Sequence, residues 1–308
     1  MSRAQHAIRA VNLIDRRHPA RVHSTICQIE PGCAVSDGHW QLEGTGAELY
    51  ERYLVPAITA KWAEDLLDRA QPREGEAVLD IACGTGIVAR LAAGRMGRGK
   101  VIGLDLNSGM LAVARSVPTE GVPINWMGGS ALDLPFTSDS FDVVLCQLGL
   151  QFFPDQTRAL DEMRRVLKRS GRAGLSVYSE IERTPGANAF VLALDAVLGR
   201  DASRIKRGEH RFTAAAQLET LLRAAGFNAV DVQTVEQTIV FPSVLDYVQF
   251  RLLATPMASL LKDRTASERQ EIILSVASKT TALSTSAMLE GGTFTFPQQA
   301  YVAATLGG

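Results

Sequence analysis

The sequence has no surplus of charge of either sign, since 32 Lys and Arg residues stand against 33 Asp and Glu residues in a chain of 308. A protein that binds nucleic acid irrespective of its sequence needs a broad cationic surface, so this balance argues against a free-standing binder of that class. The apolar content of 46% lets the chain bury a large core, which excludes disorder as its main state.

Long apolar runs are also missing. No stretch reaches the roughly 18 apolar residues that a membrane span requires, and the N-terminus lacks the apolar core of a signal peptide. We therefore expect a cytoplasmic chain without a membrane span. Residues 1–23 carry five arginines against the single acid Asp15, a bias that weakly resembles a transit peptide, but a solvated basic arm is the favoured interpretation.

Cysteine is scarce, and the four residues are Cys27, Cys33, Cys83 and Cys146. So few cysteines in a chain of this length do not make a disulfide framework. The two in apolar strand-like runs are expected to be reduced and buried. Cys27 and Cys33, taken with His18 and His23, match no ligand spacing of a known metal site, so we expect no bound metal.

The first helix is expected from Ala47 to about Ala70, after an N-terminal arm of residues 1–46. Its apolar side chains recur at steps of three and four residues, at Leu49, Tyr53, Leu54, Ile58, Trp62, Leu66 and Leu67. Proline lacks a backbone N–H and clashes with the preceding helical turn, so Pro56 is expected to kink this helix or split it in two.

Strands and helices then alternate, which predicts a mostly parallel sheet with helices on both faces. The expected strands span residues 77–81, 101–104, 124–127, 141–145 and 173–178. The helices between them span residues 87–93, 109–115 and 156–167. Asp155 is the expected N-cap of the last of these helices, and Gly171 its C-cap.

The regular alternation of strands and helices ends after Tyr178. A helix at residues 214–225, ended by Gly226, and strands at 230–240 and 294–304 complete an expected α/β sheet of seven strands. Helical insertions at roughly 180–211 and 243–290 interrupt this second half and should form a lid. We expect one domain over residues 47–308.

The most informative segment is Val78–Arg90, which reads V-L-D-I-A-C-G-T-G-I-V-A-R. A strand brings Asp80 near its carboxyl end, Gly84 and Gly86 let the backbone pass close to a ligand, and a helix follows at once. Open α/β sheets bind ligands at this edge. The segment fits the dinucleotide pattern G-x-G-x-x-G/A loosely, but Asp80 would repel a pyrophosphate. It suits a ligand that carries an ammonium group.

D-I-A-C-G-T-G, Asp80–Gly86, resembles the nucleotide loop of class I S-adenosylmethionine-dependent methyltransferases. It is similar in particular to the small-molecule branch that includes the ubiquinone and menaquinone biosynthesis C-methyltransferases. Four stretches match in order, and the resemblance extends from about Leu49 to Val177. It implies a Rossmann-like class I methyltransferase fold with S-adenosylmethionine as cofactor. In this first stretch it places Asp80, Ala82, Cys83, Gly84 and Gly86 on that cofactor.

The second and third matching stretches are Val101–Leu111 and Gly129–Phe136. By resemblance Asp105 holds the ribose, because a carboxylate can accept from both hydroxyls, while Leu106 and Met110 flank the adenine. At the position where relatives have an acidic residue that accepts a hydrogen bond from the adenine amino group, this chain has Ser130. Its hydroxyl can still accept such a hydrogen bond. A backbone N–H of Ala131 or Leu132 would then pair with a ring nitrogen.

The fourth matching stretch, Phe141–Asp155, should face the methyl group and the acceptor. Cys146, Gln147 and Gln151 are the candidates there. Many relatives place a histidine near Gln151, and glutamine is no base at neutral pH. A general base therefore has to come from elsewhere, and the weak candidates are His39, Tyr53 and His210, together with Tyr50.

The lid should supply an apolar pocket for a small, partly apolar acceptor that is methylated on O, N or C. Its candidate residues are Phe190, Phe212, Tyr247, Phe250, Leu253, Met257 and Met288, unless these simply pack the helices together. Three alternatives remain open: a nucleic-acid or protein methyltransferase, a module that binds S-adenosylmethionine without turnover, and an NAD-linked dehydrogenase. The first alternative is weakened because the N-P-P-Y or D-P-P-Y motif of amino-methylating enzymes is replaced by C-Q-L-G-L.

Overall fold

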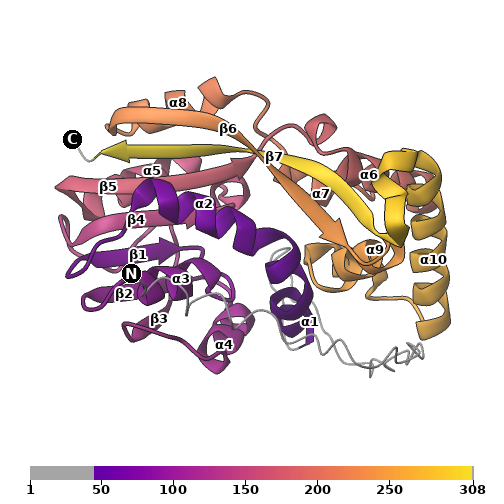
Figure 1. Ribbon diagram of the computed structural model, residues 1–308, viewed down its shortest axis with the longest axis horizontal. Helices are drawn as coiled ribbons and strands as arrows, with labels where there is room; N and C mark the ends of the chain where they lie inside the picture. The colour runs from indigo at the N-terminus through magenta and orange to yellow at the C-terminus, as the bar shows by residue number, and fades with distance from the viewer. Residues whose placement is uncertain (1–44, 307–308) are drawn as a thin grey trace, which may run out of the picture. The chain divides into compact units, whose positions relative to one another are not determined.

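A computed structural model describes residues 45–306, and its strands are β1 (Ala77–Ile81), β2 (Lys100–Asp105), β3 (Ile124–Gly128), β4 (Phe141–Gln147), β5 (Leu167–Tyr178), β6 (Asn228–Phe241) and β7 (Phe294–Leu306). They form one seven-stranded sheet in the order β3–β2–β1–β4–β5–β7–β6 (Figure 1). Only β7 runs antiparallel to its neighbours. The expected α/β fold is therefore confirmed.

Two layers of helices cover the two faces of the sheet. On one face, α2 (Ala60–Ala70) and α3 (Ile87–Arg95) pack against a core that includes Val78 and Val143. On the other, α5 (Gln156–Val166) and α8 (Ala215–Ala224) pack against the next residues along the same strands, Leu79 and Val144. Because successive side chains of a strand point to opposite faces, strands buried on both sides read as continuous apolar runs.

The first helical segment is not split at Pro56, one of the two outcomes expected there, but it departs from regular α-helical geometry around this residue. It consists of α1 (Thr45–Leu49), a wide π-type stretch η1 (Tyr50–Thr59) and α2. The N–H of Ala60 donates to the carbonyl of Val55, five residues back. A wider turn relaxes the i to i−4 geometry with which a proline ring conflicts, and Pro56 is exposed on its surface. The expected boundary of the arm, at residue 46, falls inside α1.

The expected C-cap at Gly171 is also wrong. Helix α5 begins after Asp155, whose side chain accepts from the N–H of Arg158 as expected, but it ends at Val166, and β5 begins at the next residue. The pairing of β4 with β5 is irregular at this point, where the register shifts. A Cβ on Gly171 would lie 2.9 Å from the carbonyl oxygen of Asp142, so this glycine permits a close approach within the sheet.

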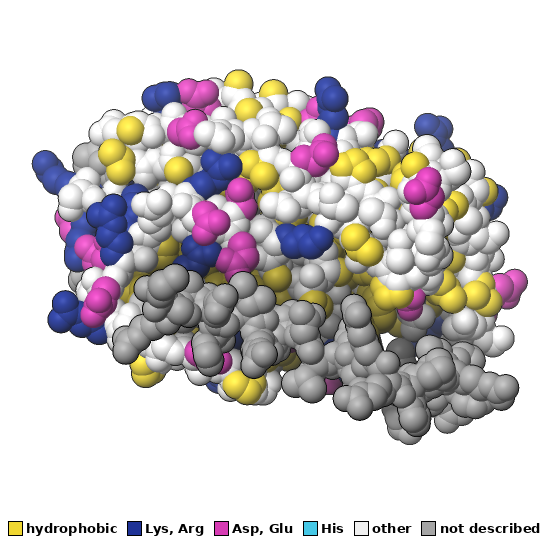
Figure 2. Space-filling view, in the orientation of Figure 1, with side chains coloured by type: hydrophobic (Ala, Val, Ile, Leu, Met, Phe, Trp, Pro, Cys, Tyr) yellow, Lys and Arg dark blue, Asp and Glu magenta, His cyan; other side chains and the backbone are white. Residues whose placement is uncertain are grey.

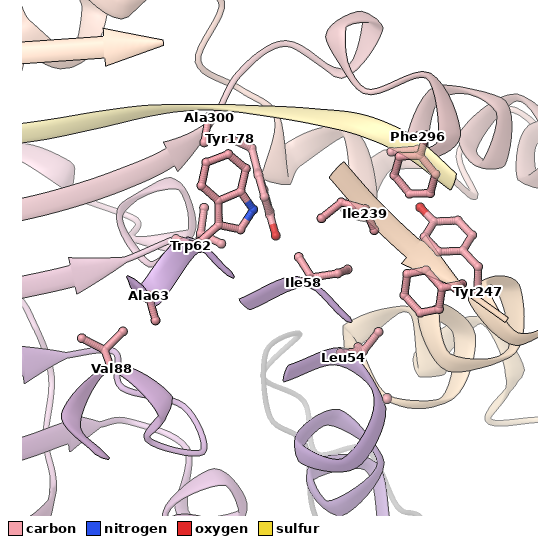
Figure 3. Packing of buried hydrophobic residues seen from close by; sticks show 14 of the residues in the cluster. Leu54, Ile58, Trp62, Ala63, Val88, Tyr178, Ile239, Tyr247, Phe296 and Ala300 are labelled. Carbon is pink, nitrogen blue, oxygen red and sulfur yellow. The ribbon is translucent and has the colours of Figure 1, made fainter. Parts of the chain in front are cut away.

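The lid surrounds the part of the antiparallel β6–β7 pair that extends beyond the rest of the sheet. Residues 294–299 of β7 pair with β6 alone, beyond the end of β5. Around this extension lie α6 (Pro185–Leu198), α7 (Arg204–Glu209), α9 (Val244–Leu253), η4 (Pro256–Leu261), α10 (Ala266–Leu283) and η5 (Ser286–Gly292) (Figure 1). The ring of Tyr247 packs at their centre against those of Phe190, Phe241, Phe294 and Phe296, with centroids 5.1–5.5 Å apart (Figure 3).

This packing corrects the expected acceptor pocket. Phe190, Tyr247 and Met257 are fully buried between the lid elements, and Phe212 and Met288 are buried as well. The apolar surface of Phe190, Tyr247, Met257 and Met288 stabilises the lid itself, whereas Phe212 packs in the core beside α5 and α8.

Basic and acidic side chains are interspersed on the face that Figure 2 shows, without a large area of one sign. Among the described residues no single helix is long and apolar enough to cross a membrane. The pair α10 and η5 would reach that length and composition only if it were counted together across a bend of 120°.

Candidate functional site

A cavity of about 590 Å³ opens at the carboxyl ends of β1, β2 and β4 and continues to the lid. From β1 the chain continues to β2 and β3 on one side of the sheet, whereas β4 and β5 lie on the other side of β1. Open α/β sheets bind ligands at such a topological switch point. One end of the cavity is lined by the loop after β1 and by the ends of β2 and β3. We name it the motif end. The other, the lid end, includes Tyr178, Glu209, Arg251 and residues 254–256.

The loop after β1 turns sharply, and its two glycines have different tasks. Gly84 lines the cavity with φ +56°, and a Cβ added to it would meet no protein atom within 4 Å, so it leaves open space for a ligand. Gly86, with φ +91°, precedes α3, and its added Cβ would lie 2.2 Å from the indole of Trp126. The structure therefore does not bring Gly86 to the cavity; packing requires its lack of a side chain.

Asp80 lies on the cavity at the end of β1 and is only 1% exposed. Its Oδ2 accepts from the N–H of Ala89 on α3 at 3.0 Å. Its Oδ1 is buried without a hydrogen-bond partner among the described residues. Burial raises the pKa of this carboxyl to about 8. This carboxyl is therefore mostly protonated near pH 7 in the free protein, and a cationic donor from a ligand would favour its ionised form and satisfy the unpartnered oxygen.

Asp105 follows at the end of β2 and organises the neighbouring backbone. Its Oδ2 accepts from the N–H of Gly84 and its Oδ1 from the N–H of Asn107, both at 2.7 Å. A carboxylate has about four lone-pair positions, so both oxygens can accept further hydrogen bonds on the cavity side. Burial raises the pKa of Asp105. Asn107 in turn caps α4 (Ser108–Ser116) through the N–H groups of Gly109 and Met110.

The remaining residues expected to contact the cofactor also lie at the motif end. Leu106, Met110, Ser130, Ala131 and Leu132 line the cavity, as do Ala82 and Cys83. Leu106 is 69% exposed, and an exposed leucine at the mouth of a cavity suits contact with a flat ring. The Oγ of Ser130 accepts from the N–H of Leu132 at 3.1 Å, so Ala131 is left as the better donor to a ring nitrogen.

Of the three candidates expected to face the methyl group, Cys146, Gln147 and Gln151, only Gln147 lines the cavity. Its Nε2 donates to the carbonyl of Thr59 at 2.9 Å. Cys146, one residue earlier, points to the other face of the sheet, where burial raises the pKa of its thiol to about 12. Gln151 is buried in η2 (Leu150–Phe152) and does not line the cavity either. Strand alternation explains why only one of two adjacent candidates reaches the site.

The candidate bases are not brought together. His39 lies outside the described residues. Tyr53 stacks on Phe250, with ring centroids 4.0 Å apart and planes 9° apart, and does not line the cavity. His210 lies behind the lid end with its Nδ1 2.8 Å from the carbonyl oxygen of Ser179. Burial and the adjacent Lys206 lower its pKa well below the usual value, so it is a poor proton acceptor. Tyr50 does line the cavity.

Three polar side chains at the lid end, Tyr178, Glu209 and Arg251, were not anticipated. Tyr178 ends β5, Glu209 ends α7 and Arg251 lies on α9. A signal for Arg251 exists in the sequence. It follows the core residue Tyr247 by four positions, which places a charge on the otherwise apolar buried face of α9. No described group of three or more His, Cys, Asp or Glu residues has the geometry of a metal site.

Comparison with known proteins supports this picture. Residues 54–242 match the family model described as the ubiE/COQ5 methyltransferase family. A 2-phytyl-1,4-naphtoquinone methyltransferase of Thermosynechococcus vestitus is 38% identical over 137 residues, which are 43% of this chain and 61% of that protein. A demethylmenaquinone methyltransferase of Listeria monocytogenes is 32% identical over 187 residues, which are 56% of this chain and 78% of that protein.

A solved structure shows the same fold at low identity. Phosphoethanolamine N-methyltransferase 2 of Haemonchus contortus in complex with S-adenosyl-L-methionine superimposes with a TM-score of 0.54 and 18% identity. The match covers 85% of this chain and 56% of that one.

Proposed function

This chain belongs to the ubiE/COQ5 methyltransferase family, and from that premise we propose that it transfers a methyl group from S-adenosylmethionine to a reduced, quinol-type aromatic acceptor. The observation that carries the proposal is the single cavity that joins the loop after β1 to the lid. A transfer between two ligands requires that both lie in one enclosure with their reacting atoms about 3 Å apart.

The motif end fits the cofactor. The unpartnered Oδ1 of Asp80 would accept from the ammonium group of the amino-acid tail, and the bare Gly84 leaves room for that tail. Asp105 would accept from the ribose hydroxyls, while Leu106 and Met110 would enclose the adenine. When bound, S-adenosylmethionine supplies a methyl group that a sulfonium makes electrophilic. The loop and the three strand ends then serve to hold and orient it.

The lid end fits a flat, partly apolar acceptor. Ala254 and Pro256 line it beside the polar Thr255, and Phe152 and Phe153 line the same cavity. Such a mixture of apolar walls and a few polar groups is typical of sites for small molecules. The names of the relatives point to naphthoquinone-type acceptors, and we extend that substrate class to this chain. Independence from nucleic acids and a cytoplasmic location remain predictions of the sequence.

The reduced form of the acceptor follows from the direction of electron flow. A ring carbon has to provide the electron pair for the new bond to the methyl carbon, and two hydroxyl groups enrich the ring for this step. In the oxidised quinone the same carbon is electron-poor and cannot act as a nucleophile. After transfer the ring loses a proton from that carbon and becomes aromatic again.

The test is a turnover assay with the full chain, S-adenosylmethionine and a matched pair of acceptors, 1,4-naphthohydroquinone and 1,4-naphthoquinone. We expect release of S-adenosylhomocysteine and a product heavier by one methylene unit with the hydroquinone alone. Phenethylamine serves as an amine control. Turnover with the amine and not with the hydroquinone would contradict the acceptor class. A protein that binds S-adenosylhomocysteine but turns over none of the three would contradict the assignment as an enzyme for such acceptors.

A further inference from the structure

The lid end of the cavity contains a buried cluster of charges to which the family resemblance assigns no role. It comprises Lys206 and Glu209 on α7 and Arg251 on α9, which are 0%, 3% and 5% exposed. Charged residues are rarely buried so completely unless they are paired. Glu209 and Arg251 both line the cavity, so the pairing within this cluster decides which charge a ligand would meet.

Two of the three charges neutralise each other. Lys206 and Glu209 form an ion pair one helical turn apart. The Lys206 ammonium also lies 5.2 Å from the centroid of the Tyr178 ring. Burial and the neighbouring Arg251 lower the pKa of Lys206 to about 8, so it is still mostly protonated near pH 7 and the pair persists. Glu209 is therefore not a free anion at the cavity wall.

The remaining charge, on Arg251, forms no ion pair with a described residue, although Tyr247 and Glu209 lie near enough to raise its pKa. None of the ion pairs within residues 45–306 includes it, and its Nε is buried without a hydrogen-bond partner there. The guanidinium carbon lies 5.7 Å from the centroid of the Tyr247 ring. An arginine keeps its charge at every relevant pH. Removing such a charge from water costs roughly several kcal/mol in protein interiors, and no full ion pair in the described part of the chain offsets that cost here.

The other titratable groups nearby add no negative charge. Burial raises the pKa of Tyr50 to about 12 and raises that of Tyr178 and Tyr247 as well, so all three are neutral. His210, stacked on Tyr178 at 5.0 Å, is neutral because its pKa is lowered. Asp80 and Asp105 belong to the motif end. The lid end therefore presents one net positive charge to whatever enters it.

We propose that Arg251 binds an ionised acidic oxygen of the acceptor, and that the lid end is a subsite for an aromatic oxyanion. This inference rests on the proposed function and adds the feature by which the acceptor is recognised. A guanidinium presents several donors in one plane to an oxyanion, and charge-assisted hydrogen bonds of this kind are the strong ones. A cation beside a ring hydroxyl also lowers the pKa of that hydroxyl. An ionised ring oxygen makes the ring carbon beside it more nucleophilic.

The experiment uses the full chain saturated with S-adenosylhomocysteine and simple probes. The probe 4-nitrophenol reports its own ionisation by absorbance, and nitrobenzene is the matched probe without an acidic oxygen. Benzoate against benzyl alcohol distinguishes a carboxylate from a ring oxygen. We expect the acidic probe of each pair to bind at least about tenfold more tightly than its neutral partner. We also expect the pKa of bound 4-nitrophenol to fall by about one unit or more.

Arg251→Met should remove both the preference and the pKa shift, whereas Arg251→Lys should restore part of each because it keeps the charge. Arg207→Met is the matched control. Arg207 lies on α7 beside Lys206, pairs with Asp195 and does not line the cavity, so this variant should behave like the unchanged chain. If Arg251→Met does not fold, the pKa of 4-nitrophenol bound to the unchanged chain still decides.

Equal binding of acidic and neutral probes, an unshifted pKa of the bound phenol, or a preference that survives Arg251→Met would each overturn the proposal. These outcomes are separable from a failure of the proposed function. A chain that does not bind S-adenosylhomocysteine refutes the function, whereas a chain that binds it and ignores the acidity of the probe refutes only this inference.

Discussion

The two ends of the cavity are built in different ways. At the motif end the ligand would meet backbone and short side chains from the ends of three adjacent strands, held by hydrogen bonds such as those from Gly84 and Asn107 to Asp105. At the lid end it would meet long side chains from two insertion helices and the end of β5. Under the proposed function, the first construction would hold the cofactor and the second would contact the acceptor.

The electrostatics of the two ends are opposite. The motif end contains the buried carboxyl groups Asp80 and Asp105, and the lid end has the uncompensated Arg251. A cationic donor and an anionic acceptor would each meet its complement, which orients the two ligands relative to each other. The variants below are designed to separate the two ends.

Gly84→Val should have the largest effect. At φ +56° a β-branched side chain is strained, and its methyl groups would occupy the open space beside the loop. We expect affinity for S-adenosylhomocysteine to fall by about a hundredfold or more, because the methyl groups block the ligand and a loop that relaxes its strain of roughly 1–3 kcal/mol loses the binding geometry. Isothermal titration measures the loss. Gly94→Ala is the control, because an added Cβ on this residue of α3 meets nothing within 4 Å. Unchanged affinity in the Val variant would show that the ligand lies elsewhere.

Asp80→Asn should lower the affinity for S-adenosylhomocysteine by about tenfold or more. The carboxylate that accepts a charge-assisted hydrogen bond from the ammonium group is replaced by a neutral amide. The lid end should be unaffected. The same variant is therefore expected to keep the preference for 4-nitrophenol over nitrobenzene, measured at saturating cofactor product. Loss of that preference would mean that the two ends are not independent.

Without cofactor, the same substitution should stabilise the protein. The pKa of Asp80 is about 8 when folded, against an ordinary value of 3.8. The folded state therefore binds the proton more tightly, and stability falls as the pH rises from about 4 towards 8. Asn cannot ionise, so Asp80→Asn should melt at a higher temperature than the unchanged chain by roughly 5 °C near pH 8, with little difference near pH 4. A difference that does not grow with pH would contradict this account.

Tyr53→Phe should have the smallest effect. The ring would still stack on Phe250, and the lost hydroxyl does not line the cavity. Turnover with 1,4-naphthohydroquinone should change by less than about twofold. Tyr50→Phe is the informative partner, because Tyr50 does line the cavity and its loss should raise KM for the acceptor several-fold. A large loss of kcat in Tyr53→Phe alone would revive that residue as the base.

The motif end could be predicted from the sequence because its residues lie in short segments that resemble a known family and that follow successive strands. Asp80 and Gly84 lie in one segment, and strand order places Asp105 and Ser130 beside them. Local rules failed where packing decided. Pro56 is accommodated by a wide turn, Gly86 is required by the indole of Trp126, and Cys146 and Gln147 point to opposite sides of one strand.

The lid end could not be predicted, because Tyr178, Glu209 and Arg251 are distant in sequence and meet only through tertiary packing. The apolar residues that looked suited to a pocket became the core of the lid instead. A charged residue on the otherwise apolar buried face of a helix, as at Arg251, was the more useful signal of a residue that lines the cavity.

The most direct test of this account is a crystal structure of the full chain grown with S-adenosylhomocysteine. We predict density in the cavity with the amino group at Oδ1 of Asp80, the ribose at Asp105 and an open path from the sulfur to Arg251. Cofactor product bound elsewhere, or with its amino group away from Asp80, would contradict the central claim that the loop after β1 holds the methyl donor.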